Sequence, residues 1–144
     1  VAMGEGKCAV QNALGEDSTV NYRAVPRCIY TSPEVAGVGL TEDEAREKYD
    51  KVRVGRFPFA ANGRALVLNE TQGMVKVIAD AQYDEILGVE IIGPGATDLI
   101  AEAVLAIQLE VTFRDLAYTI HAHPTLSEAV MEAFLAVSGE VIHI

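Results

Sequence analysis

The segment 97–110 (TDLIAEAVLAIQLE) is predicted to form a helix, and this helix is apolar around almost its whole circumference. Its apolar positions are Leu99, Ile100, Ala103, Val104, Leu105, Ala106, Ile107 and Leu109. A helix with so little polar surface has to be covered on more than one side. One small sheet covers a single side only, so a second chain or a second domain is expected to pack against it.

Strands are predicted ahead of this helix. The segment 51–60 alternates apolar and polar residues, as a strand with one solvent-facing side does. The segments 73–80 and 85–93 are joined by the turn AQYD and are expected to form a hairpin. Within 27–40, two shorter extended pieces are expected on either side of Ser32-Pro33. Neighbouring strands are antiparallel in this scheme and the helices come late. The predicted fold class is therefore α+β, an antiparallel sheet with helices packed on one side.

Two short helices are predicted from their starting residues. Thr41 is followed three positions later by Glu44, the spacing of a capping box, and a helix is expected over 41–49. The same pattern starts a helix over 112–119. A last helix is expected to begin near Thr125 and to turn its apolar residues inward.

The first part of the chain looks separate from the rest. Residues 1–15 are rich in alanine and end in a glycine, which predicts a helix with a glycine stop. This helix begins abruptly, without a cap or an initiator methionine, as expected for a piece of something larger. Residues 16–25 are interpreted as a connector, and residues 26–144 as the main domain.

Composition points to one globular domain. The chain has 144 residues, 50% of them hydrophobic and 22% charged, which is enough to form a packed core. The formal net charge of −10 argues against nucleic acid and anionic membranes as partners, because both bind basic surfaces. No apolar run approaches the roughly 20 residues of a membrane span, and no signal peptide is recognisable.

Most candidate motifs are interpreted structurally. Cys8 and Cys28 are the only cysteines and lack the CxxC spacing, so they are predicted to be free thiols in a reducing compartment. No zinc or iron–sulfur pattern occurs, and no metal site is predicted. The glycine-rich stretch 93–100 lacks GxGxxG and the Walker lysine, and is interpreted as a tight strand-to-helix turn. The stretch 32–39 offers only Glu34 as a titratable group, and no chemistry is assigned to it.

The segment HAHPTLSEA holds two of the three histidines in one chain turn. One interpretation is purely structural. Thr125 is then the N-cap of the last helix, Glu128 is its capping-box partner, and Pro124 keeps the preceding chain out of the helix.

The second interpretation is functional. His121 and His123 point to the same side if the segment is extended, and Pro124 is able to hold a cis bond. Glu128 lies close enough along the chain to accept a hydrogen bond from an imidazole and to fix its orientation and tautomer. An imidazole–carboxylate pair is a common acid/base device. The chain supplies no nucleophile, metal site or nucleotide loop to complete it, and the residues alone leave both interpretations open.

Four stretches resemble a known family: VPRCIYTSPEVAGVGLTEDEAREKY, FPFAANGRALVLNETQGMVKVIAD, ILGVEIIGPGATDLIAEAVLAI and HAHPTLSEAVMEAF. Together they look like the C-terminal interface domain of the dihydrolipoamide dehydrogenase family, a branch of the flavin-dependent pyridine nucleotide-disulfide oxidoreductases. The resemblance covers about residues 25–144, and its most specific motif is HxHPTxxE. Residues 1–15 resemble the last helix of the FAD-binding part of such enzymes.

The resemblance implies a division of labour between two subunits. The full enzyme is a homodimer that carries FAD, NAD and a redox-active CxxxxC disulfide outside this chain. His123 would take a proton from the dihydrolipoamide thiol in the partner's active site, and Glu128 would orient it. His121, Ala122 and Pro124 would lie near the partner's flavin, Pro124 as a cis-proline. The isolated chain is then expected to bind no cofactor and to be inactive.

The resemblance also implies the setting of the parent enzyme. It would oxidise dihydrolipoamide with NAD⁺ as final acceptor, and would join a 2-oxo acid dehydrogenase complex through lipoyl domains. It would work in the cytoplasm of a bacterium or in the mitochondrial matrix. Two alternatives stay open: a related disulfide reductase of the glutathione reductase or transhydrogenase type, and a non-catalytic interaction module.

Overall fold

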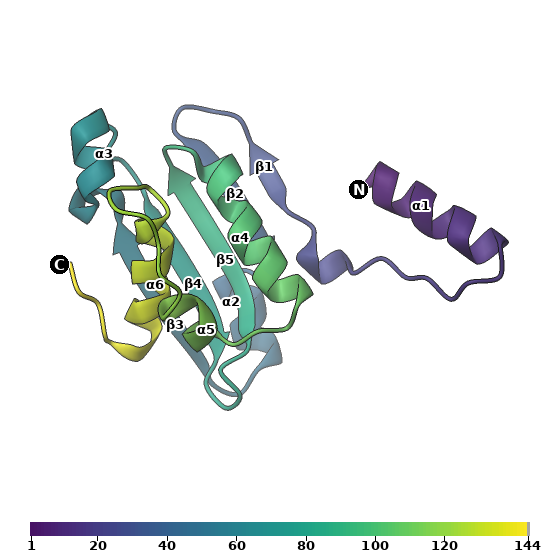
Figure 1. Cartoon of the computed structure of the whole chain (residues 1–144). Coiled ribbons are helices and arrows are strands. Elements are labelled where there is room, and N and C mark those ends of the chain that lie inside the picture. The colour runs from purple at the N-terminus through teal and green to yellow at the C-terminus, as the bar shows by residue number, and fades with distance from the viewer. Residues whose placement is uncertain (144) are drawn as a thin grey trace.

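The computed structural model describes residues 1–143 and is built on one five-stranded antiparallel sheet (Figure 1). The strands are β1 (Arg27–Ile29), β2 (Glu34–Gly39), β3 (Val52–Pro58), β4 (Met74–Asp80) and β5 (Ile86–Gly93). Their order across the sheet is β1-β2-β5-β4-β3, and every neighbouring pair is antiparallel. The predicted strands are confirmed, including the β4–β5 hairpin across the turn at 81–84.

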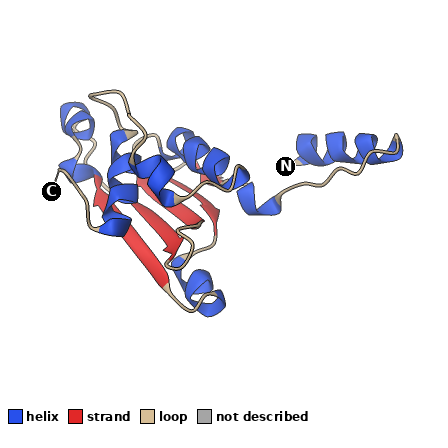
Figure 2. Cartoon of the chain, turned by 60° about the horizontal axis from the view of Figure 1, so that its bottom comes forward, coloured by secondary structure: helices blue, strands red, loops and turns tan. Residues whose placement is uncertain are grey.

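Three helices cover one face of this sheet (Figures 1 and 2). They are α4 (Ala96–Gln108), α5 (Phe113–Ala117) and α6 (Glu128–Ser138). Helix α4 packs on β2 and β5, and α6 packs on β3 and β4. The predicted α+β class with helices on one side is therefore confirmed. The shorter elements are α2 (Glu42–Lys48), α3 (Gly63–Leu68) and the 3-10 turns η1 (Tyr22–Ala24) and η2 (Phe59–Ala61).

The main core lies between the sheet and these three helices. Alternate residues of β4 and β5 point into it, as the two-residue period of a strand requires. Its largest fully buried side chains include Phe57, Phe59, Phe113, Phe134, Ile91 and Ile100. Helix α6 comes close to β3 at Gly55. A Cβ added there would lie 2.2 Å from the carbonyl oxygen of Ala133. Glycine at this position therefore lets α6 rest directly on the sheet.

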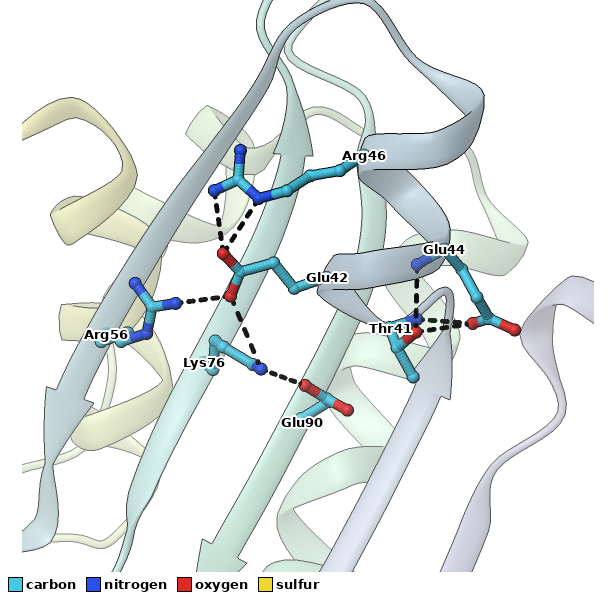
Figure 3. Close-up of polar contacts among 7 residues, drawn as sticks. All are labelled: Thr41, Glu42, Glu44, Arg46, Arg56, Lys76 and Glu90. Carbon is cyan, nitrogen blue, oxygen red and sulfur yellow. Dashed lines mark hydrogen bonds and ion pairs between the residues drawn. The ribbon is translucent and has the colours of Figure 1, made fainter.

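The opposite face of the sheet carries α2 and a cluster of charges (Figure 3). Thr41 and Glu44 form the predicted capping box at the start of α2. Ala45 packs on Ile78 and Leu87 in a small second core. Beside it, the Glu42 carboxylate pairs with Arg46, Arg56 and Lys76, and Lys76 also reaches Glu90. These ion pairs make the outer face of the sheet polar, and each of them contributes little to stability.

Helix α1 (Ala2–Ala13) lies apart from the sheet at the end of an extended segment (Figures 1 and 2). It buries none of its residues, and the predicted glycine Gly15 follows it with φ +92°. The helix itself is thus as predicted. The assignment of residues 1–15, 16–25 and 26–144 to separate units remains a prediction.

Two features of the fold differ from the sequence prediction. Helix α3 stands in a region for which no element was predicted, because its six residues are too few to show helical periodicity. The last helix begins at Glu128, with Ser127 as N-cap, and not near Thr125. Within residues 1–143 no helix is both long enough and apolar enough to cross a membrane.

Candidate functional site

The histidine turn, residues 119–127, runs between α5 and α6. The side chains of Ala122, His123 and Pro124 are exposed, and the His123–Pro124 peptide bond is cis, as the sequence suggested. The turn is fixed to the body of the domain by Asn62, which is only 4% exposed. The Asn62 amide donates to the carbonyl oxygen of Thr125 at 3.0 Å, and its own oxygen caps α3 by accepting from the Ala65 N–H at 2.9 Å.

His123 and Glu128 are brought together as the functional interpretation required. The Nδ1 atom of His123 lies 2.9 Å from Oε1 of Glu128. The His123 side chain is 78% exposed, whereas that of Glu128 is 17% exposed. A largely buried carboxylate at the start of α6 thus holds an imidazole that projects from the surface.

The second oxygen of Glu128 serves the backbone. Oε2 accepts the N–H of Thr125 at 2.8 Å, which is half of the predicted capping box. The other half is absent, because the Thr125 hydroxyl does not accept from the Glu128 N–H; it donates to the carbonyl oxygen of Ala122 at 2.6 Å and lies 2.8 Å from the Ser127 hydroxyl. The interpretation of Thr125 as N-cap was wrong, since the helix begins at Glu128 with Ser127 as its N-cap. Glu128 nevertheless combines the two roles that the sequence left as alternatives.

Glu128 is an ionised carboxylate at neutral pH. Burial, the largest single influence, raises its pKa. The hydrogen bonds from the Thr125 N–H and from His123, together with the charges of His123 and His143, outweigh burial and leave the pKa below its ordinary value. A carboxylate only accepts hydrogen bonds, so the Nδ1 atom of His123 must be the donor. In the neutral ring the Nε2 atom then carries the lone pair. Among residues 1–143 no side chain or backbone group bonds to that atom.

His121 is placed quite differently from His123, although two positions separate them. Its side chain is only 7% exposed. The Nδ1 atom lies 2.8 Å from the carbonyl oxygen of Thr119, and Nε2 lies 2.8 Å from Oε1 of Glu102 on α4. His121 therefore contacts the backbone of its own turn, while its predicted position near the partner's flavin remains a prediction. Its carboxylate partner was not foreseen, since Glu102 is 19 positions away and no local pattern links the two residues.

The glycine-rich stretch before α4 is a turn, as predicted. Gly95 takes a left-handed conformation there, with φ +64°, as N-cap of the helix. The Glu34 carboxylate occupies the helix start, accepting from the N–H and the hydroxyl of Thr97 at 2.9 and 2.8 Å. These bonds lower the pKa of Glu34. An acidic side chain is stabilised at this position by the positive end of the helix dipole. It occupies the place where a phosphate would bind.

The remaining candidates add no chemistry within the described chain. Cys8 and Cys28 are free thiols. No group of three or more metal-ligating side chains is found among residues 1–143. Apolar side chains are exposed on α4 and on the chain after it, an exposed apolar set formed by Leu105 on the helix (58% exposed), Leu109 at its C-cap (63%) and Ile120 in the histidine turn (96%). The expectation that this helix needs a second covering surface agrees with that exposure.

The domain is an antiparallel sheet covered by helices, and it exposes apolar side chains and an anchored imidazole. These features are typical of a domain that packs against another domain or subunit. Comparison with known families gives the same class. The model of the pyridine nucleotide-disulphide oxidoreductase dimerisation domain matches residues 25–134. The chain belongs to this family.

Its relatives include dihydrolipoyl dehydrogenases. The enzyme of Thermus scotoductus is 52% identical over 143 residues, which are 99% of this chain and 31% of that protein. A Bacillus subtilis enzyme is 51% identical over 144 residues, 99% of this chain and 30% of that protein. The mitochondrial enzyme of Pisum sativum is 45% identical over 140 residues, 97% of this chain and 28% of that protein. The chain thus spans less than a third of the length of these relatives.

Solved structures show the same fold. LpdA from Mycobacterium tuberculosis superposes with a TM-score of 0.83 at 30% identity, over 90% of this chain and 28% of that one. The HOCl-induced flavoprotein disulfide reductase RclA from Escherichia coli, in a Cu(II) complex of a mutant, gives 0.86 at 28% identity, over 93% and 31%. The chain therefore has the fold and the sequence of a pyridine nucleotide-disulphide oxidoreductase dimerisation domain, and it is similar over almost its whole length to part of dihydrolipoyl dehydrogenases.

Proposed function

We propose that the parent enzyme oxidises dihydrolipoamide to lipoamide with bound FAD and NAD⁺ as final acceptor, and that His123 and Glu128 of this domain act in the partner subunit's active site. The names of the relatives that are about half identical to the chain support the reaction. The observation that carries the role of the pair is its geometry. Glu128 fixes Nδ1 of a projecting ring, which leaves Nε2 of His123 directed away from the domain as a proton acceptor.

The proposed chemistry begins with a proton transfer to this nitrogen. Dihydrolipoamide carries two thiols, and a thiolate attacks a disulfide far faster than a thiol does. Nε2 of His123 takes the proton of one thiol, and the thiolate formed attacks a sulfur of the partner's redox disulfide. That step makes a mixed disulfide and releases the second protein sulfur as thiolate. The negative charge of Glu128 stabilises the imidazolium while it holds the proton.

The described residues suit a supporting role toward FAD and NAD. The start of α4, where a phosphate would bind, is occupied by the Glu34 carboxylate, so the cofactors are expected to be held elsewhere in the enzyme. Bound there, the cofactors would supply the redox chemistry that carries electrons from the reduced dithiol to NAD⁺. His121, Ala122 and Pro124 are proposed to lie near the partner's flavin. The isolated chain is accordingly proposed to bind neither cofactor and to have no turnover.

Assembly follows from the same surface. We propose a homodimer in which the exposed apolar set is covered by the second subunit, because exposed apolar surface of this kind marks protein–protein interfaces. Binding to a 2-oxo acid dehydrogenase complex through lipoyl domains is proposed because of the similarity to dihydrolipoyl dehydrogenases. The relatives come from bacteria and from plant mitochondria, which supports bacterial cytoplasm or mitochondrial matrix as the location.

The test is His123→Gln in the full-length enzyme. Glutamine keeps polarity and approximate size but is no base, so turnover with dihydrolipoamide should fall on the order of 10²–10⁴-fold. FAD content and the dimer should be unchanged. The matched control is His143→Gln. This ring is also exposed and also bonded to a carboxylate, that of Glu132, but it lies outside the turn. Because the charge of His143 contributes to the lowered pKa of Glu128, the control should lose far less turnover than His123→Gln.

A second candidate is a non-catalytic role for the turn. The bond from the Thr125 N–H favours it, because Glu128 would be needed for this bond even if His123 did nothing. Unchanged turnover in His123→Gln would select this alternative. A disulfide reductase of another specificity is the third possibility, in line with the likeness to RclA. Turnover with glutathione disulfide but not with lipoamide would select it.

A further inference from the structure

The ring of His121 lies between two hydrogen-bond acceptors. On one side is the carbonyl oxygen of Thr119, 2.8 Å from Nδ1. On the other side is the carboxylate of Glu102, 2.8 Å from Nε2. A carbonyl oxygen never donates, and a carboxylate oxygen likewise only accepts. Both contacts can be hydrogen bonds only if both ring nitrogens carry a proton.

The charges around the ring favour that state. From α4, Glu102 presents its carboxylate directly to the ring, and its hydrogen bond is the largest influence raising the pKa of His121 above the ordinary value. Burial acts in the opposite direction. The Thr119 carbonyl after α5 and the negative charge of Glu128 at the start of α6 add to the upward shift. Each element packed against the ring thus contributes an acceptor or a negative charge.

Three side-chain contacts, including the bond between His121 and Glu102, hold the histidine turn in position. The Glu102 contact ties the beginning of the turn to α4, whereas Asn62 ties Thr125 to the start of α3, and Glu128 ties His123 to α6. Helix α4 also carries part of the exposed apolar set. The position of His123 relative to α4 therefore depends on the Glu102 contact.

We infer that His121 is an imidazolium hydrogen-bonded at both ring nitrogens, and that its ion pair with Glu102 positions the histidine turn against α4. Glu102 and His121 are positioning residues in this account. The effect on catalysis rests on the proposed function, but the charge state of His121 does not.

The charge state is tested directly in the full-length enzyme by NMR with ¹³C-labelled histidine rings. The His121 resonance is identified by its loss in His121→Gln. Its titration midpoint should lie above the ordinary value of 6.5. In Glu102→Gln, which keeps the shape but removes the charge, the midpoint should move down. A wild-type His121 midpoint at or below 6.5 would overturn the inference, whatever the outcome for His123.

The positioning role is tested by turnover of the same variants. Glu102→Gln should lower kcat with dihydrolipoamide on the order of tenfold to a hundredfold, because small misplacements of a reacting group have effects of this size. The remaining activity should follow the new His121 midpoint in its pH profile. Glu102→Asp, which restores the charge, should recover part of the rate. The control Glu110→Gln removes a charge just beyond the end of α4. Equal kcat and pH profile in wild type and Glu102→Gln would refute the positioning role, while His123→Gln separately decides the proposed function.

Discussion

Glu128 resolves the question posed by the histidine turn, because each of its two oxygens has a separate task. One oxygen accepts from His123 and the other from the Thr125 backbone. The backbone bond fixes the carboxylate, and the fixed carboxylate fixes the ring. A residue needed to hold a loop in place is thereby also the residue that selects the tautomer of the projecting imidazole.

The first prediction concerns Glu128→Gln in the full-length enzyme. Glutamine is able to keep one of the two hydrogen bonds but loses the charge that stabilises the imidazolium. A hydrogen bond to a charged group contributes about 1.5–3 kcal/mol, so turnover with dihydrolipoamide should fall roughly tenfold to a hundredfold. Steady-state kinetics at neutral pH measure the effect. A rate equal to wild type would show that the carboxylate has no part in the reaction.

The same variant has a pH signature in stability. The pKa of Glu128 is lowered in the folded state, so its contribution to the free energy of unfolding is present above the ordinary value of 4.5 and is lost as the pH falls through the lowered value. Thermal unfolding midpoints below about pH 4.5 should therefore converge between wild type and Glu128→Gln. A gap between them that widens on acidification would contradict the folded-state charge assigned to Glu128.

At the scale of elements, the close approach of α6 to β3 decides where the pair stands. Gly55→Ala places a methyl group 2.2 Å from the Ala133 carbonyl oxygen and 2.7 Å from the Val137 nitrogen, both backbone atoms of α6. The helix has to move away, and overpacking of this kind costs about 1–3 kcal/mol. We expect a lower thermal unfolding midpoint and, since α6 begins with Glu128, a lower turnover.

The control for this prediction is Gly63→Ala. Gly63 begins α3 and has no atom within 4 Å of an added Cβ, so the same chemical change meets empty space. It should leave both stability and turnover near the wild-type values. If the two alanine variants have the same unfolding midpoint and turnover, the close contact between α6 and the sheet does not determine the stability or the activity.

Most elements follow from local patterns in the sequence. The alternation in 51–60 correctly predicted the strand β3, and the spacing of Thr41 and Glu44 correctly predicted the capping box of α2. Helix α6 was predicted to begin too early because Thr125 has the right residue type and spacing for a cap. In the folded chain the helix begins at Glu128 with Ser127 as N-cap, and the Thr125 hydroxyl bonds to the Ala122 carbonyl within the turn, which spacing alone does not reveal.

The contacts that hold the site together were beyond such patterns. Asn62 and Thr125 are 63 positions apart, as are Glu34 and Thr97, and each pair meets only because the sheet order brings its elements together. The projecting His123–Glu128 pair was predictable because both residues lie in one short motif. Its support was not, because hydrogen bonds between distant residues leave no periodic signal in a single sequence.

At the scale of the whole molecule, the proposed role of the domain is to contribute residues to the active site of a second subunit. The exposed apolar set and the exposed ring of His123 both belong to surface that the domain does not cover itself. The chain has no described group that could be the sulfur partner of that ring, since its cysteines lie in α1 and β1. The active site of the parent is therefore proposed to form only between two subunits.

The most direct measurement of this claim is a mixed dimer of the full-length enzyme, co-expressed with two affinity tags. One subunit carries His123→Gln, and the other carries serine in place of its redox-active cysteines. Each homodimer alone should be inactive. In the mixed dimer the intact His123 of the second subunit faces the intact disulfide of the first, so the account predicts the turnover of one working site in two. A mixed dimer as inactive as both homodimers would show that His123 does not act across the interface.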